Sequence, residues 1–168
     1  MAVLHISDLH LGHRNIIHYR EGFETVAEHD EFVVDQILTN VSKRDKLFLH
    51  GDVCFSKDAM VGLKKITDYL NCALILGNHD LESNARPTIF ELHEMFGKNI
   101  FSMLSYKGTW LTHAPIHPSE LRGKYNLYGH SHGYKVDDTR YYNVCCEQVD
   151  YKPILHTKVM EWLVENNK

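Results

Sequence analysis

The sequence predicts an α/β fold in which short buried strands alternate with amphipathic helices. From Val3 to Leu76, short apolar runs alternate with longer stretches in which apolar residues recur at helical spacing. Each apolar run also ends abruptly at a polar segment that contains Asp, Asn or His. Alternation of strand and helix is typical of crossover units, whose functional residues gather at the carboxyl ends of the strands. We therefore expect a single functional site at one edge of a sheet.

Three strands and two helices are expected in the first half of the chain. The first helix, from about Thr25 to Val41, has an apolar stripe, acidic residues near its start and Lys43 and Arg44 just past its end, which suits the helix dipole. The second, from Asp58 to Leu70, carries its apolar residues on one side. The expected strands run from about Ala2 to Ile6, from Leu47 to Leu49 and from Leu74 to Leu76.

The second half is expected to turn toward antiparallel strands. Ile100 to Tyr106 and Thr109 to Leu111 flank Lys107 and Gly108, a pattern that predicts a hairpin. A short helix from Thr88 to Phe96, closed by Gly97, precedes this hairpin. The remaining expected elements are strands at Asn126 to Tyr128 and Arg140 to Cys146 and a final helix from about His156 to Glu165.

Length and composition predict one domain, residues 1–168. The chain has 168 residues, enough for one core and too few for two ordinary domains. With 43% hydrophobic and 24% charged residues it has the composition of a globular protein, and no apolar run reaches the length of a membrane span. Because a strand is expected at the N-terminus in place of a secretory signal, we expect a cytoplasmic protein that does not contact membranes. The oligomeric state is left open.

Cysteine spacing, charge and histidine content narrow the classes of function. The four cysteines have neither a zinc-type spacing nor a disulfide framework, so reduced thiols in the core are expected. A net charge of -4 gives no sign of a basic face, which neither supports nor excludes a nucleic-acid substrate. Thirteen histidines are many for this length, and histidine both ligates metals and moves protons near neutral pH.

Polar residues at the expected strand ends predict a divalent-metal site. Carboxylate, amide and imidazole ligands suit Mn, the first choice here, with Fe, Zn, Ni, Co or Mg as alternatives. Taken singly, each fragment has another interpretation, such as a turn residue or a surface histidine. Together these fragments offer more ligands than one ion can bind, so two ions about 3.5–4 Å apart are expected. Asp52 would bridge the two ions, and an activated hydroxide would lie between them. The candidate ligands are Asp8, His10, Asp52, Asn78, His113, His130 and His132, with His79 beside them.

The order of these fragments resembles the calcineurin-like metallophosphoesterase superfamily, above all its small bacterial and phage members. The matching pattern is Asp-x-His, Gly-Asp, Gly-Asn-His-Asp, a single His and Gly-His-x-His, in order from residue 8 to residue 132, and the loop 11–17 is also similar. The resemblance implies two facing mixed β-sheets, a β-sandwich, flanked by α-helices in four layers. It also implies a metal-dependent phosphoesterase, a hydrolase of phosphodiester or phosphomonoester bonds.

The resemblance further implies a role for each residue. One metal would take Asp8, His10, Asp52 and His132, and the other would take Asp52, Asn78, His113 and His130. His79 would donate a proton to the leaving alkoxide, which requires a nearby carboxylate. Many relatives supply it three residues after the Gly-Asp aspartate, where this chain has Phe55, so Asp80 is the candidate substitute.

Substrate contacts and substrate class are the least determined. Arg14, Asn15 and His117 lie in loops directly after expected ligands, so they are candidates for substrate binding, although a solvated loop is an alternative for each. A small phosphate ester, a nucleotide or a nucleic-acid end is expected as substrate. The alternative function is a non-catalytic metal-binding module for protein interaction on the same fold.

Overall fold

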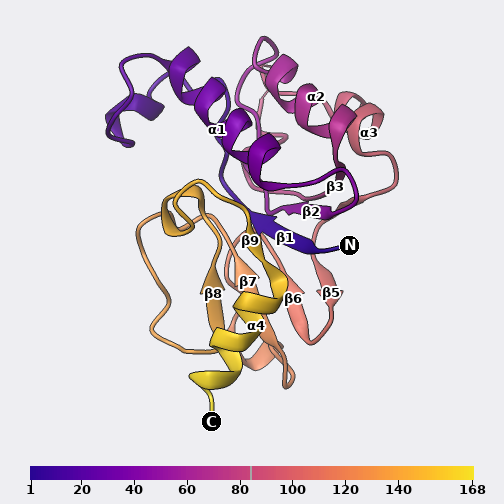
Figure 1. The fold of residues 1–168 in the computed structure, drawn as a ribbon, viewed down its shortest axis with the longest axis vertical. Helices are drawn as coiled ribbons and strands as arrows, with labels where there is room; N and C mark the ends of the chain where they lie inside the picture. Colours follow the sequence, from indigo (N-terminus) through magenta and orange to yellow (C-terminus); the bar gives the residue numbers. More distant parts are fainter. Residues whose placement is uncertain (84) are drawn as a thin grey trace.

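The computed structural model describes residues 1–83 and 85–168, and within these residues it contains two mixed β-sheets and four α-helices (Figure 1). The first sheet has the order β4-β3-β2-β1-β9 and the second the order β5-β6-β7-β8. The strands of the first sheet are β1 (Val3–Ile6), β2 (Lys46–Leu49), β3 (Asn71–Ile75), β4 (Ile100–Phe101) and β9 (Ile154–Leu155). Those of the second are β5 (Leu104–Tyr106), β6 (Thr109–Leu111), β7 (Tyr125–Tyr128) and β8 (Tyr141–Asn143). The helices are α1 (Val26–Asn40), α2 (Met60–Tyr69), α3 (Ile89–Phe96) and α4 (His156–Glu165).

Helices α1 and α3 begin where the sequence provides a capping residue. The Thr25 side chain accepts a hydrogen bond from the Glu28 amide at the start of α1. Thr88 and Glu91 form a reciprocal capping box at the start of α3, which ends at Gly97 with a φ of 56°. These helices and α2 connect the four parallel strands β1 to β4, as the alternating pattern of the first half predicts.

Alternate residues of the first sheet face two different hydrophobic clusters. In β2, Leu47 and Leu49 pack in a cluster with residues of α1, α2 and α3, whereas Phe48 packs in a second cluster. That second cluster also contains Leu111 and Leu127 of the second sheet. Figure 1 shows α1, α2 and α3 gathered on one side of β2 and β3, with β5 to β8 on the other. The first sheet is therefore buried on both faces, which explains its nearly continuous apolar strands.

The expectation that the later strands are antiparallel is correct only for one hairpin and the edge strand β9. Lys107 and Gly108, with φ of 43° and 84°, make the tight turn between the antiparallel strands β5 and β6. Strands β6, β7 and β8 pair in parallel, because long connections return the chain to the same end of the sheet before each strand begins. Segment periodicity does not determine this pairing direction.

Three of the expected strands differ from those observed. The strand expected from Leu74 to Leu76 is β3, which begins at Asn71 and ends at Ile75. The run from Ile100 to Tyr106 is divided into β4, which pairs with β3, and β5, which pairs with β6, so the chain leaves the first sheet for the second within this run. The expected strand from Arg140 to Cys146 is shortened to β8, after which Cys145 forms an isolated parallel bridge with Ser7. This bridge brings the segment after β8 to the end of β1.

Two expectations from composition agree with the described structure. The four cysteines are buried free thiols. No helix in residues 1–83 and 85–168 combines the length and the apolar character needed to cross a lipid bilayer.

Candidate metal centre

The predicted ligands converge where five strands end. Asp8 and His10 follow β1, Asp52 follows β2, Asn78 follows β3, and the remaining three histidines follow β6 and β7. Two backbone hydrogen bonds hold the segments that follow β1 and β2 together. The Asp8 amide donates to the Gly51 carbonyl (3.0 Å), and the His10 amide donates to the Asp52 carbonyl (3.0 Å). Several ligands adopt left-handed backbone conformations, which non-glycine residues rarely do and which cluster at functional sites. They are Asp8 (φ 60°), His10 (φ 54°), Asp52 (φ 52°), His130 (φ 69°) and His132 (φ 45°).

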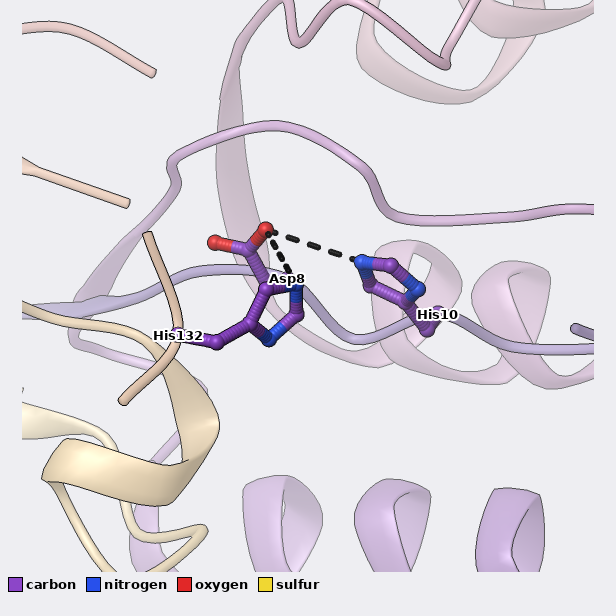
Figure 2. Close-up of side chains that lie close together, drawn as sticks. All are labelled: Asp8, His10 and His132. Carbon is purple, nitrogen blue, oxygen red and sulfur yellow. Dashed lines mark ion pairs between the residues drawn. The ribbon is translucent and has the colours of Figure 1, made fainter. Parts of the chain in front are cut away.

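The convergence produces two groups of three side chains, each able to hold a metal ion. In each group, one ligand atom from every residue lies within 4.8 Å of the others. In the first group, Asp8 Oδ1 lies 3.6 Å from His10 Nε2 and 3.7 Å from His132 Nε2, and the three side chains point toward one another (Figure 2). The second group consists of Asp52, His113 and His130.

Asp52 lies between the two groups. Its Oδ2 atom is 4.0 Å from His10 Nε2 in the first group and 3.3 Å from His113 Nε2 in its own group. Its Oδ1 atom accepts a hydrogen bond from the His79 amide at 2.9 Å, which fixes the rotation of the carboxylate. Asn78 joins the second group, because its Oδ1 lies 2.9 Å from His113 Nε2.

The chemistry of the first group fits a divalent cation. Asp8 Oδ1 and His10 Nε2 are buried and have no hydrogen-bond partner among the described residues, 1–83 and 85–168. Buried polar atoms are almost always satisfied, and an isolated carboxylate oxygen is costly to remove from water. A cation bound by both atoms would remove that cost, and these are the atoms that face His132.

The local environment favours the metal-binding protonation states of Asp8 and His10 but favours a protonated His113. Burial opposes ionisation of Asp8, but its contact with His10 and the charges of His113 and His132 hold the pKa of Asp8 below its usual value. Burial lowers the pKa of His10, which favours the neutral imidazole. Burial would also lower the pKa of His113, but its hydrogen bond with Asp52 and the charges of Asp8 and Asp52 raise that pKa to about 9. A bound cation would replace the proton that these carboxylates stabilise on His113.

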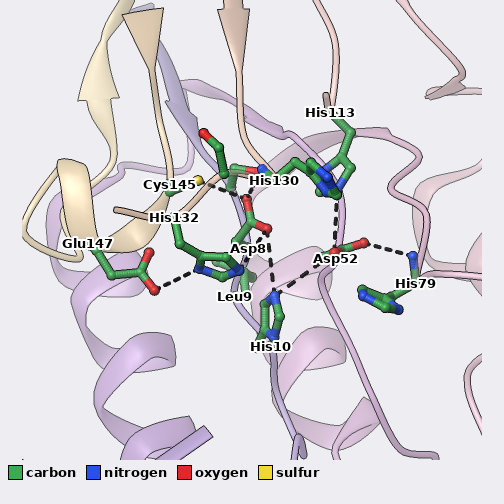
Figure 3. A network of polar contacts seen from close by, with 12 residues as sticks. Asp8, Leu9, His10, Asp52, His79, His113, His130, His132, Cys145 and Glu147 are labelled. Carbon is green, nitrogen blue, oxygen red and sulfur yellow. Dashed lines mark hydrogen bonds and ion pairs between the residues drawn. The ribbon is translucent and has the colours of Figure 1, made fainter. Parts of the chain in front are cut away.

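Hydrogen bonds to the far ring nitrogens orient two of the histidines. His113 Nδ1 donates to the His50 carbonyl at 2.7 Å, which leaves Nε2 toward the centre. His132 Nδ1 donates to Glu147 Oε1 at 2.9 Å, with the same result (Figure 3). Partners of this kind fix the tautomer and increase the basicity of metal-binding histidines.

Arg20 connects Glu147 to the first strand end. Its guanidinium is fully buried and donates to Glu147 Oε1 (2.8 Å), to the Asp8 carbonyl (2.6 Å) and to the Leu9 carbonyl (3.2 Å). Sequence reasoning missed both Arg20 and Glu147. Neither belongs to a motif, and they lie far apart in the chain, so the sequence alone contained no signal for this contact.

Two glycines allow the loops to approach the carboxylates closely. A Cβ atom at Gly77 would collide with Asp52 Oδ1 and lie 2.5 Å from the Asp52 amide nitrogen. A Cβ atom at Gly129 would collide with Ser7 Oγ and lie 2.5 Å from Asp8 Oδ2. The glycines in the Gly-Asn-His-Asp and Gly-His-x-His segments are therefore required by the lack of space for a side chain.

The carboxylate partner of His79 differs from the expected one. His79 Nδ1 contacts Glu82 Oε2 at 2.5 Å, and Arg86 holds the same oxygen at 3.1 Å. Asp80, expected to take this position, instead accepts hydrogen bonds from the Gly77, Asp52 and Val53 amides. Burial raises the pKa of Asp80 to about 6. Glu82 takes the place expected for Asp80 because the turn after His79 directs Asp80 inward and brings Glu82 back beside the imidazole. The i, i+3 spacing of His79 and Glu82 was a signal that could have been used.

The three expected substrate contacts lie in exposed loops. Arg14 and Asn15 are exposed, and Asn15 is at the start of a short 3-10 helix (Ile16–His18) without capping it through its side chain. His117 is also exposed, and its Nδ1 accepts a hydrogen bond from the Ser119 amide. Within the described residues, none of the three lines either of the cavities beside the centre.

Those two cavities lie next to different groups of ligands. One, of about 540 Å³, is lined in part by His10 and His132 of the first group. The other, of about 560 Å³, is lined in part by Asn78, His113 and His130 of the second group. Space for a ligand is therefore present beside each candidate metal position.

The fold and the site together define a mixed α/β protein with two candidate His/Asp metal-binding groups, and comparison with known proteins adds to this description. No family model matches the chain. MJ1445, an uncharacterised protein of Methanocaldococcus jannaschii, is 26% identical over 176 aligned positions, which cover 97% of this chain and 91% of that protein.

Two solved structures were compared with the fold. The structure of AQ665, a protein of unknown function from Aquifex aeolicus, matches with a TM-score of 0.72 at 20% identity over 95% of this chain and 98% of that chain. The two proteins therefore share a fold. The phosphopantetheinyl hydrolase of Mycobacterium tuberculosis has a TM-score of 0.40 at 20% identity over 69% of this chain and 42% of that chain.

Proposed function

We propose that this protein is a phosphoesterase that uses two divalent metal ions and belongs to the small bacterial and phage type of the calcineurin-like superfamily. The observation that carries the proposal is the position of the Asp52 carboxylate between two groups of His and Asp ligands. A carboxylate shared by two adjacent cation positions is an arrangement that can stabilise both the attacking and the leaving oxygen of an in-line displacement at phosphorus. The same proposal includes a single domain, residues 1–168, in which the two sheets form a sandwich with helices outside.

The side chains divide the chemistry between them. When bound, two divalent cations would supply an activated water nucleophile and neutralise negative charge on the phosphoryl group. Asp8 and Asp52 would hold these cations at a fixed spacing. His79, whose amide donates a hydrogen bond to Asp52, would donate a proton to the leaving oxygen, and Glu82 would orient its ring through the contact with Nδ1.

Metal and substrate follow from the ligand chemistry. Four imidazoles with two carboxylates and one amide oxygen suit borderline ions, so Mn is the first candidate and Fe, Zn, Ni, Co and Mg are the alternatives. The substrate would be a small phosphate ester, a nucleotide or a nucleic-acid end, and the protein would act in the cytoplasm. Such substrates do not need an enclosed charged channel, and the two open cavities leave room for molecules of these sizes.

Hydrolysis of phosphate esters by two variants tests the proposal. His79→Ala should retain metal but lose about 100-fold or more in kcat on esters with poor leaving groups, and much less on p-nitrophenyl esters, which need little help from an acid. Asp52→Asn should reduce both metal content, measured by elemental analysis, and rate. His93→Ala, in an exposed position on α3, is the matched control.

Two results would contradict the proposal. If the protein bound Mn but hydrolysed none of a panel of monoesters, diesters and anhydrides, a non-catalytic binding module would replace the enzyme. If His79→Ala had no effect on esters with poor leaving groups, His79 would lose its role as proton donor while the metal centre remained.

A further inference from the structure

We propose that the cavity beside His10 and His132 binds an uncharged planar aromatic ring that is attached to the phosphate. This inference rests on the proposed function, because it assigns one part of the substrate of the same site. The cavity has a volume of about 540 Å³. It shares His10 and His132 with the first metal-binding group, so a phosphate held there would direct one substituent into it.

Part of the cavity lining comes from the segment that follows His10 and includes two rings. His13, Ile16 and Tyr19 form this wall, and the His13 and Tyr19 rings are nearly parallel, with 8° between their planes and 6.5 Å between their centroids. His13 also lies 4.6 Å from the Phe55 ring, measured between centroids. Tyr19 is 76% exposed, which leaves most of its surface free for a ligand. Planar rings stack favourably on such side chains.

The charge of the cavity excludes a second phosphate from this position. Within the described residues, no Lys or Arg lines it. The one carboxylate of its lining belongs to Glu147, whose Oε1 is already engaged by Arg20 and His132. A negatively charged substituent would therefore lie near a carboxylate without a Lys or Arg in the described cavity lining to pair with, whereas a neutral ring needs no such partner.

Buried residues on both sides of Tyr19 fix this wall. Ile16 is 2% exposed, and its carbonyl accepts hydrogen bonds from the Tyr19 amide (3.0 Å) and the Arg20 amide (2.9 Å). The Arg20 side chain is held by two backbone carbonyls and Glu147. Because Tyr19 is attached to a segment that is already ordered, little entropy is lost when a ring stacks on it.

Calorimetric binding to the Mn-loaded full-length protein tests the inference without relying on turnover. The probes are phenylphosphonate, methylphosphonate and inorganic phosphate. Phenylphosphonate should bind more tightly than methylphosphonate. Tyr19→Ala should weaken phenylphosphonate binding about 5-fold to 100-fold, and Tyr19→Phe should retain it. Binding of methylphosphonate and inorganic phosphate should be unchanged in both variants. Tyr69→Ala, at an exposed tyrosine that does not line this cavity, should change none of them.

Equal affinity for the phenyl and methyl compounds, or an unchanged phenylphosphonate affinity in Tyr19→Ala, would overturn the inference. Neither result would affect the proposed hydrolysis, since that depends on the metal groups and His79. Adenosine 5′-monophosphate, measured in the same way, distinguishes two sources of the ring. A loss of its affinity in Tyr19→Ala supports a nucleobase, and a loss confined to phenylphosphonate supports a simple aryl ester.

Discussion

Replacement of Glu147 by Gln tests whether contacts outside the ligand groups organise the centre. Glu147 Oε1 accepts hydrogen bonds from His132 Nδ1 at 2.9 Å and from Arg20 Nε at 2.8 Å. Burial opposes ionisation of Glu147, but these two partners hold its pKa at about 2, so it is charged across the physiological range. The substitution keeps the size of the side chain and one acceptor oxygen but removes the charge.

The expected effects are a loss of both metal affinity and stability. Mutation of a side chain that hydrogen-bonds to a metal-binding histidine usually weakens metal binding 10-fold to 100-fold, and we expect about that loss of Mn affinity. The Arg20 guanidinium is fully buried, and a buried charge left without its partner costs about 3–5 kcal/mol. Because the Glu147 side chain is 26% exposed and Arg20 keeps two carbonyl acceptors, about 2–3 kcal/mol is the better expectation here.

Two measurements separate these effects. Urea unfolding in the presence of a chelator measures stability without metal, and calorimetric titration measures Mn affinity under conditions in which the variant is folded. Glu120→Gln is the control, because it removes the same charge from an exposed Glu–Arg pair, with Arg122, for which less than about 1 kcal/mol is expected. If Glu147→Gln bound Mn as tightly as the wild type, the negative charge of Glu147 would not be what supports His132 as a ligand.

Two further predictions follow from close packing and from burial of titratable groups. Gly129→Ala should destabilise the fold by more than about 2 kcal/mol and abolish metal retention, because its Cβ would collide with Ser7 and Asp8. Gly133→Ala, whose Cβ would meet open space, should do neither. Unfolding curves measure the stability of both variants, and elemental analysis measures their metal content. Burial lowers the pKa of three interacting histidines, so the unfolded chain binds more protons than the folded one as the pH falls. The free energy of unfolding of the metal-free protein should therefore contain a contribution that is present above pH 6.5 and is lost as the pH falls toward 4. The loss should be up to about 1.4 kcal/mol per pH unit for each histidine. The three histidines are His5, His50, whose pKa falls to about 4, and His156. His156→Gln should reduce the slope in urea unfolding between pH 6.5 and 4, and an equal slope in wild type and variant would contradict this origin.

The sequence predicted the parts of the site that depend on local order. Asp8, Asp52 and Asn78 each lie two or three residues after the end of an apolar strand, and parallel neighbouring strands bring such ends together. Their meeting at one edge could therefore be inferred without coordinates. The helices of the first half were predictable for a similar reason, since their apolar stripes face one cluster.

Features that depend on tertiary pairing were not predictable in this way. The parallel pairing of β7 with β6 and β8 depends on where long loops return the chain, and no residue in β7 itself specifies it. Arg20 and Glu147 meet because the Cys145 bridge to Ser7 brings the segment after β8 to the exit of β1. Neither the parallel pairing of β7 nor the contact between Arg20 and Glu147 has a signature in nearby residues, so only the folded structure reveals them.

Phe55 stands where the superfamily pattern that we propose for this chain would have a carboxylate serving His79. Its ring centroid is 5.2 Å from that of His79 and 3.6 Å from the Arg86 guanidinium carbon. A cation held over an aromatic face is stabilised there, and Arg86 in turn holds Glu82 Oε2 at 3.1 Å. Glu82 thereby reaches His79 from the following turn. We infer that Phe55 supports the histidine indirectly, by fixing the arginine that positions its carboxylate, so the absence of an acid at this position does not argue against His79 as a proton donor.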